Sequence, residues 1–238
     1  MLALSDWLLL ATIVMVVPVY SYFNGRRLQT IAGANRRSLY LRSIAVQWLL
    51  AAVTLYAWWR HDRPFDALGF SIVPGMVTTS AEIVCVMAAI AVFLRLRKMA
   101  GWAPEKLAAL RERLGGTAVV VPRTRAELAW FLLVAVTAGI CEELLYRGFF
   151  FAVAAPFVTV YGAAVASAIV FGLGHTYQGW RGIALTAAVG LFLGAFYFLT
   201  GSIVFPMFLH VLIDVNGGVS GYFLLRSDEK LSEGLSRG

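Results

Sequence analysis

The sequence contains few charged residues and few cysteines, and both shortages exclude whole classes of protein. Charged residues make up 14% of the 238 residues and hydrophobic residues 60%, whereas soluble domains carry roughly 25% charged residues. The two cysteines, Cys85 and Cys141, lie in apolar segments and form no Cys-x-x-Cys pair. Such cysteines support neither a disulfide framework nor a closed structural zinc site. The composition therefore excludes both an ordinary soluble domain and a disulfide-stabilised secreted one.

What the sequence has in abundance is long apolar runs, which recur along its whole length and give a mean hydropathy of +0.77. A helix that crosses the hydrocarbon core of a bilayer needs about 20 mostly apolar residues. The predicted spans are residues 7–23, 43–59, 79–94, 128–153, 158–175, 183–199 and 204–225. The sequence therefore predicts an all-α fold, a polytopic transmembrane helical bundle of about seven spans.

Two of the links between these runs have features of their own. Residues 67–78 are too short and too interrupted by Pro74-Gly75 to cross alone, so we interpret them as an interfacial or re-entrant piece. Residues 95–125 are polar and basic, and Pro104-Glu105 is typical of a helix start. We expect an amphipathic helix there, lying on the membrane surface.

The basic residues indicate on which side of the membrane each link lies. Cytoplasmic links are enriched in Lys and Arg, and an N-terminus outside places all but three of the 20 such residues on the inner side. The exceptions are Arg60 and Arg63, which fall outside, and Arg147, which falls within the membrane. We therefore predict an integral multi-pass protein of the plasma or inner membrane with a cytoplasmic C-terminus. The net charge of +7 reflects these links, and we expect no nucleic-acid partner.

Two adjacent carboxylates and an arginine interrupt the apolar run of residues 128–157. An ionised side chain at the centre of a bilayer costs at least about 2.5–3.5 kcal/mol, so intramembrane charges are paired or functional. Glu143 and Arg147 are four residues apart and share one helix face. Glu142 is rotated by about 100° around the helix and is left without that partner.

Both histidines of the second half also lie in apolar surroundings. His175 follows Phe171 by four residues, at the end of the predicted span 158–175, and His210 precedes Asp214 by four residues. A histidine near a membrane boundary is often only an interfacial residue. Three spans that each carry a costly titratable group, however, predict a shared polar cavity. There a carboxylate and a histidine can activate water as a general base, and a second histidine can hold an oxyanion.

The ordered triple Glu142-Glu143-x-x-x-Arg147, Phe171-x-x-x-His175 and His210-x-x-x-Asp214 resembles the three motifs of the CAAX-protease and bacteriocin-processing family of intramembrane proteases, also called abortive-infection proteins. The resemblance covers roughly residues 126–225. It implies that Glu142 and His175 activate the hydrolytic water and that His210 and Asp214 bind the oxyanion or position the substrate. Type II CAAX prenyl endopeptidases, the best-known members, usually have Asn in place of Asp214.

The resemblance also implies an activity and a division of the chain. The activity is that of an intramembrane endopeptidase without a cofactor, which hydrolyses a peptide bond of a membrane-associated or lipidated peptide or protein within the lipid bilayer. Glu143, Arg147 and Phe171 support the catalytic residues. The three regions are N-terminal membrane helices with the basic amphipathic segment (1–125), a catalytic helical core (126–225) and a polar tail (226–238).

Other interpretations stay open at this point. Glu142, His175, His210 and Asp214 could ligate zinc in a metal-dependent protease, although the sequence lacks the His-Glu-x-x-His arrangement that fixes two zinc ligands on one helix. Buried Glu, His and Asp residues also build the proton relays of transporters, but no repeat relates the two halves of this chain. A polar cluster that only holds helices together is a third reading.

The predicted spans leave the candidate residues at different depths. His175 falls near the inner end of its span, whereas Glu142 and His210 lie toward the outer half. They can meet only if the fourth span starts deeper than predicted or the fifth span continues past Gly174 toward Gly179. We expect the latter, with residues 176–180 as a buried connection lining the cavity.

Overall fold

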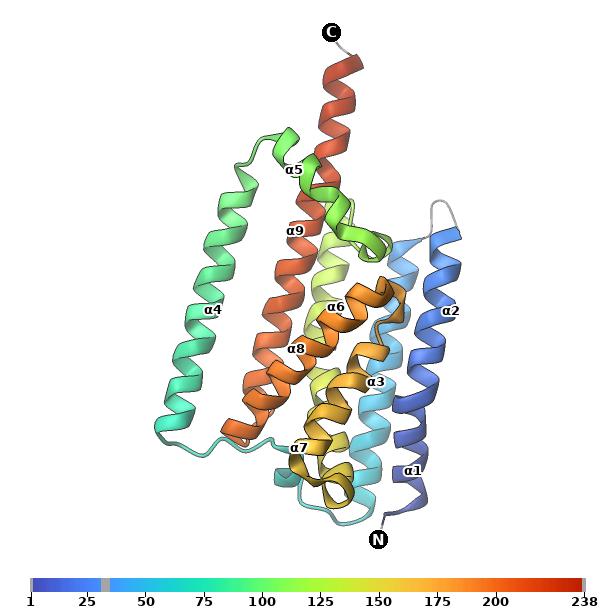
Figure 1. Ribbon diagram of the computed structural model, residues 1–238, viewed down its shortest axis with the longest axis vertical. Helices are drawn as coiled ribbons and strands as arrows, with labels where there is room; N and C mark the ends of the chain where they lie inside the picture. Colours follow the sequence, from blue (N-terminus) through green and yellow to red (C-terminus); the bar gives the residue numbers. More distant parts are fainter. Residues whose placement is uncertain (1, 31–34, 237–238) are drawn as a thin grey trace.

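The computed structural model describes residues 2–30 and 35–236, and for residues 29–30, 112–113 and 227–236 it describes the backbone alone. Residues 1, 31–34 and 237–238, which belong to the predicted N-terminal region and tail, lie outside the described residues. All regular structure in the described ranges is helical (Figure 1), which confirms the predicted all-α fold. The elements are α1 (Leu4–Ala11), η1 (Thr12–Val16), α2 (Val17–Thr30), α3 (Arg36–Arg60), η2 (Phe65–Leu68), α4 (Met76–Ala100), α5 (Pro104–Arg111), η3 (Glu112–Val119), α6 (Arg125–Glu143), η4 (Leu144–Phe149), α7 (Phe150–Leu173), η5 (Thr176–Gln178), α8 (Gly179–Thr200) and α9 (Val204–Ser236).

Six helical segments of the described chain are long and apolar enough to cross a membrane. Five of them contain 23 or 25 residues, or about 35–38 Å of helix, enough for the ~30 Å hydrocarbon core. The other, Arg125–Leu173, contains 49 residues, or about 73 Å of helix. It reverses direction inside α7 (Figure 1), and it contains both of the predicted spans 128–153 and 158–175.

The reversal inside α7 occurs at Val158 and Thr159, whose backbone angles are not helical. Pro156 lies just before them and cannot donate a backbone hydrogen bond, which weakens the helix there. Thr159 has a φ of 64°, and its hydroxyl accepts a hydrogen bond from the Gly162 amide at 3.3 Å, capping the second half of α7. The chain then runs back along itself, so the end of α7 lies beside η4.

Three local predictions have different outcomes. The helix start at Pro104 is confirmed, because α5 begins there. Residues 67–78 form no unit of their own, since Met76–Thr78 are the first turn of α4. The predicted continuation of the fifth span toward Gly179 is wrong: α7 ends at Leu173, and the His175 amide bonds back to the Gly172 carbonyl in a tighter turn. Trp180 is 74% exposed, so it does not belong to a buried connection.

Close backbone contact holds α6 against α9 and sets the distance between their side chains. A Cβ atom on Gly139 of α6 would lie 2.4 Å from Val211 Cγ2 and 2.9 Å from the Met207 carbonyl oxygen. Only a residue without a side chain fits there, which is the small-residue packing that membrane helices use. The polar residues that follow in α6 are therefore brought next to those of α9.

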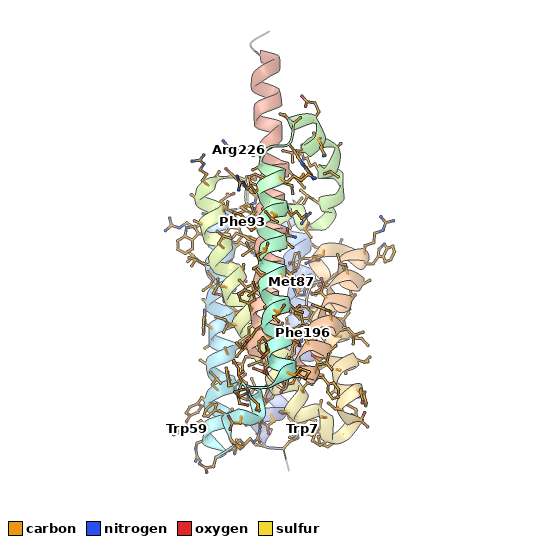
Figure 2. All side chains as sticks on the ribbon, turned by 90° about the vertical axis from the view of Figure 1, so that its left-hand side faces the viewer. Trp7, Trp59, Met87, Phe93, Phe196 and Arg226 are labelled. Atoms are coloured by element: carbon orange, nitrogen blue, oxygen red, sulfur yellow. The ribbon has the colours of Figure 1, made fainter. Side chains whose placement is uncertain are left out.

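Other parts of the surface are apolar and open to the surroundings. Met87 and Phe93 project from the outer face of α4 (Figure 2) and are 63% and 61% exposed. Trp7 and Trp59 lie at one end of the bundle and Arg226 lies toward the other (Figure 2). Exposed apolar side chains between end belts of this kind match the lipid-facing surface of a membrane protein.

Candidate active site

Glu143 forms the centre of a polar cluster inside the bundle. Its side chain is fully buried, and Oε1 lies 2.8 Å from Arg147 Nη1 and 2.7 Å from His210 Nδ1. The predicted pairing of Glu143 with Arg147 is thereby confirmed. A carboxylate paired with arginine only accepts hydrogen bonds, so His210 Nδ1 carries a hydrogen and donates it to Glu143, while Nε2 faces elsewhere.

Arg147 connects this cluster to α8. Its Nη2 donates to the Gly190 carbonyl oxygen at 2.7 Å, and its guanidinium carbon lies 4.6 Å from the centre of the Phe171 ring. Both contacts compensate the burial of the cation, by charge-assisted hydrogen bonding and by a cation–π interaction. The sequence did not predict that Gly190 binds Arg147, because every residue has a main-chain carbonyl and the residue type does not show which one is used.

Arg147 lies in η4, a π-helical stretch that directly follows the paired carboxylates. Such stretches shift the hydrogen-bond ladder and are frequent at functional sites. The buried Ser167 hydroxyl, from the returning half of α7, donates to the Tyr146 carbonyl oxygen of η4 at 2.8 Å. The sequence analysis did not single out Ser167. Its hydrogen bond connects the second half of α7 to η4 beside the polar cluster.

Glu142 has a different environment from that of its neighbour. Its side chain is 18% exposed, and its Oε2 is buried and has no hydrogen-bond partner among the described residues. His210 Nε2 lies 3.9 Å from Oε2, which is beyond direct hydrogen bonding. Glu143 Oε2 is likewise buried without a partner, but Glu143 Oε1 is held by Arg147 and His210. Glu142, in contrast, makes no hydrogen bond among the described residues and is the more exposed of the two carboxylates.

Asp214 follows His210 by one turn of α9 and lies on the same face, as the spacing predicted. Its Oδ2 is 3.7 Å from His210 Nε2, and its side chain is 32% exposed. His210 Nε2 therefore stands between the carboxylates of Glu142 and Asp214 and contacts neither at hydrogen-bond distance. The three side chains thus form one polar group, in which Glu142 and Asp214 are partly exposed and His210 is buried.

His175 lies in the turn between α7 and η5. Its Nδ1 is 2.8 Å from the Phe171 carbonyl oxygen, which can only accept, so the hydrogen is on Nδ1. The Phe171 ring lies 5.0 Å from the His175 ring and 5.6 Å from the His210 ring, between the two histidines. The structure thus places His175 next to the cluster through Phe171, and the sharing of one water between His175 and Glu142 stays a prediction.

A metal site was the alternative for the same four residues. Among the side chains that the structure describes, no group of three or more His, Cys, Asp or Glu is arranged to hold a metal ion. Glu142, His175, His210 and Asp214 therefore do not form a ligand set in this arrangement.

The sequence of the same region matches a known family. Residues 124–216 match the family model described as Rce1-like, type II CAAX prenyl endopeptidase Rce1-like. These residues form a domain of that peptidase family. The matched range contains every side chain of the cluster: Glu142, Glu143, Arg147, Phe171, His175, His210 and Asp214. No curated protein and no solved structure matches the chain. The Rce1-like domain, within a chain of apolar helices, is that of an intramembrane protease.

Proposed function

We propose that this Rce1-like protein hydrolyses a peptide bond of a membrane-associated or lipidated substrate, with Glu142 as the general base. The observation that carries the proposal is that Glu142 makes no hydrogen bond among the described residues and is partly exposed, whereas the adjacent Glu143 is fully buried and is bound by Arg147 and His210. A general base must accept a proton from water, so it needs a free carboxylate oxygen within reach of the reacting atoms. Glu142 has such an atom.

The reaction needs only water and the peptide. Glu142 takes a proton from the water, and the water oxygen attacks the carbonyl carbon of the peptide bond. The electron pair of the C=O double bond moves onto the carbonyl oxygen, which becomes an oxyanion. The C–N bond then breaks, and the departing amine receives the proton held by Glu142. The products are a carboxylic acid and an amine, and Glu142 is again ionised.

The other residues hold this arrangement in place. His175, with its hydrogen on Nδ1, has Nε2 available to accept from the attacking water. His210 is oriented by Glu143, and its Nε2 lies between Glu142 and Asp214, where it can help to position the scissile carbonyl. Arg147 fixes Glu143 and so acts through it. A preorganised site of this kind needs no rearrangement at the moment of reaction.

The surroundings of the site favour a substrate that reaches it from the membrane. The bundle presents a broad apolar surface, with exposed side chains such as Met87, Phe93 and Leu191, and the family model is named for prenylated CAAX substrates. We therefore assign as substrate class a peptide that carries a lipid group or a membrane anchor.

For the orientation of the protein in the membrane, we expect the N-terminus outside and the C-terminus in the cytoplasm.

The direct test is cleavage of quenched fluorescent peptides by the purified protein in detergent. One peptide carries a C-terminal Cys(farnesyl)-a-a-X sequence, and its control has the same sequence without the farnesyl group. We expect cleavage by the wild-type protein and none by a folded Glu142→Gln variant, because Gln keeps the shape but cannot accept the proton. Wild-type activity in Glu142→Gln would remove Glu142 as the base, and no cleavage of either peptide by the wild type would contradict the proposed substrate class.

A further inference from the structure

The hydroxyl group of Tyr146 is a polar group that the site does not yet use. The side chain as a whole is 5% exposed, and its hydroxyl makes no hydrogen bond among the described residues, whereas the Tyr146 main-chain carbonyl is bonded to Ser167. The hydroxyl oxygen is not one of the fully buried atoms that lack a partner, so a small molecule can still reach it. A phenol that is mostly enclosed, reachable and unbonded is available to donate to a substrate.

The packing around Tyr146 aims this hydroxyl at the site. Its ring lies edge-on to Phe171, with 5.1 Å between centroids and 80° between planes, on the aromatic group that also contacts both histidines. A Cβ atom on Gly174 would lie 3.2 Å from the Tyr146 hydroxyl oxygen. The hydroxyl therefore lies against the main chain directly before His175.

Glu142 precedes Tyr146 by four residues, and its carboxylate is close enough to act on the phenol electrostatically. The free carboxylate oxygen is an acceptor, and the phenol is a donor. A peptide carbonyl with an attacking water needs this combination, because the water must lose a proton while the carbonyl oxygen gains negative charge. The Glu142 carboxylate can therefore accept the proton of the water, and the Tyr146 phenol can donate to the carbonyl oxygen.

The other polar groups of the cluster supply this donor less well. An ionised Asp214 accepts hydrogen bonds and donates none. Glu143 accepts from Arg147 and His210, so it is no donor, and His210 Nδ1 is used in the bond to Glu143. Among the side chains described in the cluster, Tyr146 carries the neutral O–H group that needs no change of protonation to donate.

We propose that the Tyr146 hydroxyl donates a hydrogen bond to the carbonyl oxygen of the scissile peptide bond and stabilises the oxyanion that forms there. This inference rests on the proposed peptidase activity and adds a catalytic residue to it. The phenol keeps its proton throughout, so the balance of the hydrolysis is unchanged. One donor of this kind is worth on the order of 10²–10³ in kcat.

The first test is Tyr146→Phe, which removes one oxygen atom and keeps the ring against Phe171. We expect kcat to fall by about 10²–10³-fold, with KM little changed, because the bond strengthens as the oxyanion forms. Tyr197→Phe is the matched control. The Tyr197 ring also packs edge-on to a phenylalanine, Phe151, at 5.3 Å, but it lies outside the cluster, so its kinetic constants should match those of the wild type.

The second test identifies the atom that accepts the hydrogen bond. A thioamide replaces the amide at the bond that mass spectrometry finds cleaved, because sulfur is a much weaker acceptor than oxygen. The wild type should lose a large factor on the thioamide, and Tyr146→Phe should lose a much smaller one, as in a double-mutant cycle. Equal losses in both enzymes would mean that the hydroxyl does not touch this oxygen and would overturn the inference.

The third measurement does not depend on the Phe variant being folded. Incorporation of 3-fluorotyrosine at position 146 keeps the hydroxyl and makes it a stronger donor, so kcat should change on the amide but not on the thioamide. The same change on both substrates would overturn the inference. Failure of the peptidase proposal is distinguishable, because it appears in the wild-type protein, whereas failure of this inference leaves wild-type cleavage intact.

Discussion

His210 Nδ1 lies 2.7 Å from Glu143 Oε1, although the two residues are 67 positions apart in the chain. The same carboxylate oxygen binds Arg147, so one buried atom holds a cation of its own helix and a histidine of α9. Because Glu143 is used in this way, the adjacent Glu142 is left free. Substitution of Glu143 should therefore lower mainly the stability of the protein, and substitution of Glu142 should lower mainly its catalytic rate.

Glu143→Gln should lower the stability of the protein. The substitution leaves Arg147 buried without an ionised partner, and breaking a buried ion pair costs about 3–5 kcal/mol. We expect a lower yield of folded protein and a lower temperature of unfolding in detergent. Glu142→Gln is the matched control, since it makes the same change one residue earlier where no ion pair is lost, and it should unfold near the wild-type temperature while losing turnover. Equal stability of both variants would contradict this division of roles.

Gly139→Ala should reduce both stability and activity. The added methyl group would lie 2.4 Å from Val211 Cγ2 and 2.9 Å from the Met207 carbonyl oxygen, so α6 and α9 must move apart and carry Glu143 away from His210. Overpacking of this kind typically costs about 1–3 kcal/mol. Thermal unfolding and peptide cleavage measure the two effects.

The control for that substitution is Gly217→Ala on α9, where a Cβ atom meets nothing within 4 Å. Alanine is favoured over glycine inside a helix by roughly 0.5–1 kcal/mol, so this variant should be as stable as the wild type or more so. A loss of stability at position 217 as large as that at position 139 would argue against close packing as the cause.

Labelling with an impermeant maleimide tests the proposed orientation. Lys106 in α5 and Asp66 in η2 are exposed. The segment α5 lies at the end of the bundle opposite to the link between α3 and α4, which contains η2 (Figure 1). With Cys85 and Cys141 replaced, Asp66→Cys should react from outside intact cells, and Lys106→Cys should react only after the cells are broken. Reaction of Lys106→Cys in intact cells would reverse the orientation.

Cys141→Ala should keep peptide cleavage. Cys141 directly precedes Glu142 but is fully buried in the apolar core cluster that contains Leu144 and Phe149. Loss of its sulfur leaves a small cavity, so we expect a modest decrease in thermal stability and a nearly unchanged kcat. Loss of cleavage in a folded Cys141→Ala protein would indicate a thiol nucleophile in place of an activated water.

The part of the site that could be predicted from the sequence is the part that depends on spacing within one helix. Glu143 with Arg147, and His210 with Asp214, are four residues apart, and helix geometry alone places each pair on one face. The apolar runs likewise predicted the spans, because their length follows from the thickness of a bilayer. These relationships need no knowledge of the neighbouring helices.

The remainder depends on how the helices are rotated and how close they approach. Spacing does not tell which of two adjacent carboxylates faces α9, so the bond between His210 and Glu143 was not predicted. The π-helical stretch η4 is stabilised by Ser167 from another pass, and Arg147 binds the carbonyl of Gly190, which has no side chain to recognise. The predicted end of the fifth span was wrong for a local reason: the chain makes a tight turn in which the His175 amide bonds to the Gly172 carbonyl.

The placement of Arg147 four residues after Glu143 also affects the order in which the protein can be made. The acid and the base belong to one helix, so they can neutralise each other as soon as that helix forms in the membrane. His210 is synthesised 67 residues after Glu143, about 3–13 s later at 5–20 residues per second. Throughout that interval Arg147 is the partner that shields the carboxylate from lipid, and the site is completed only when the last span is inserted.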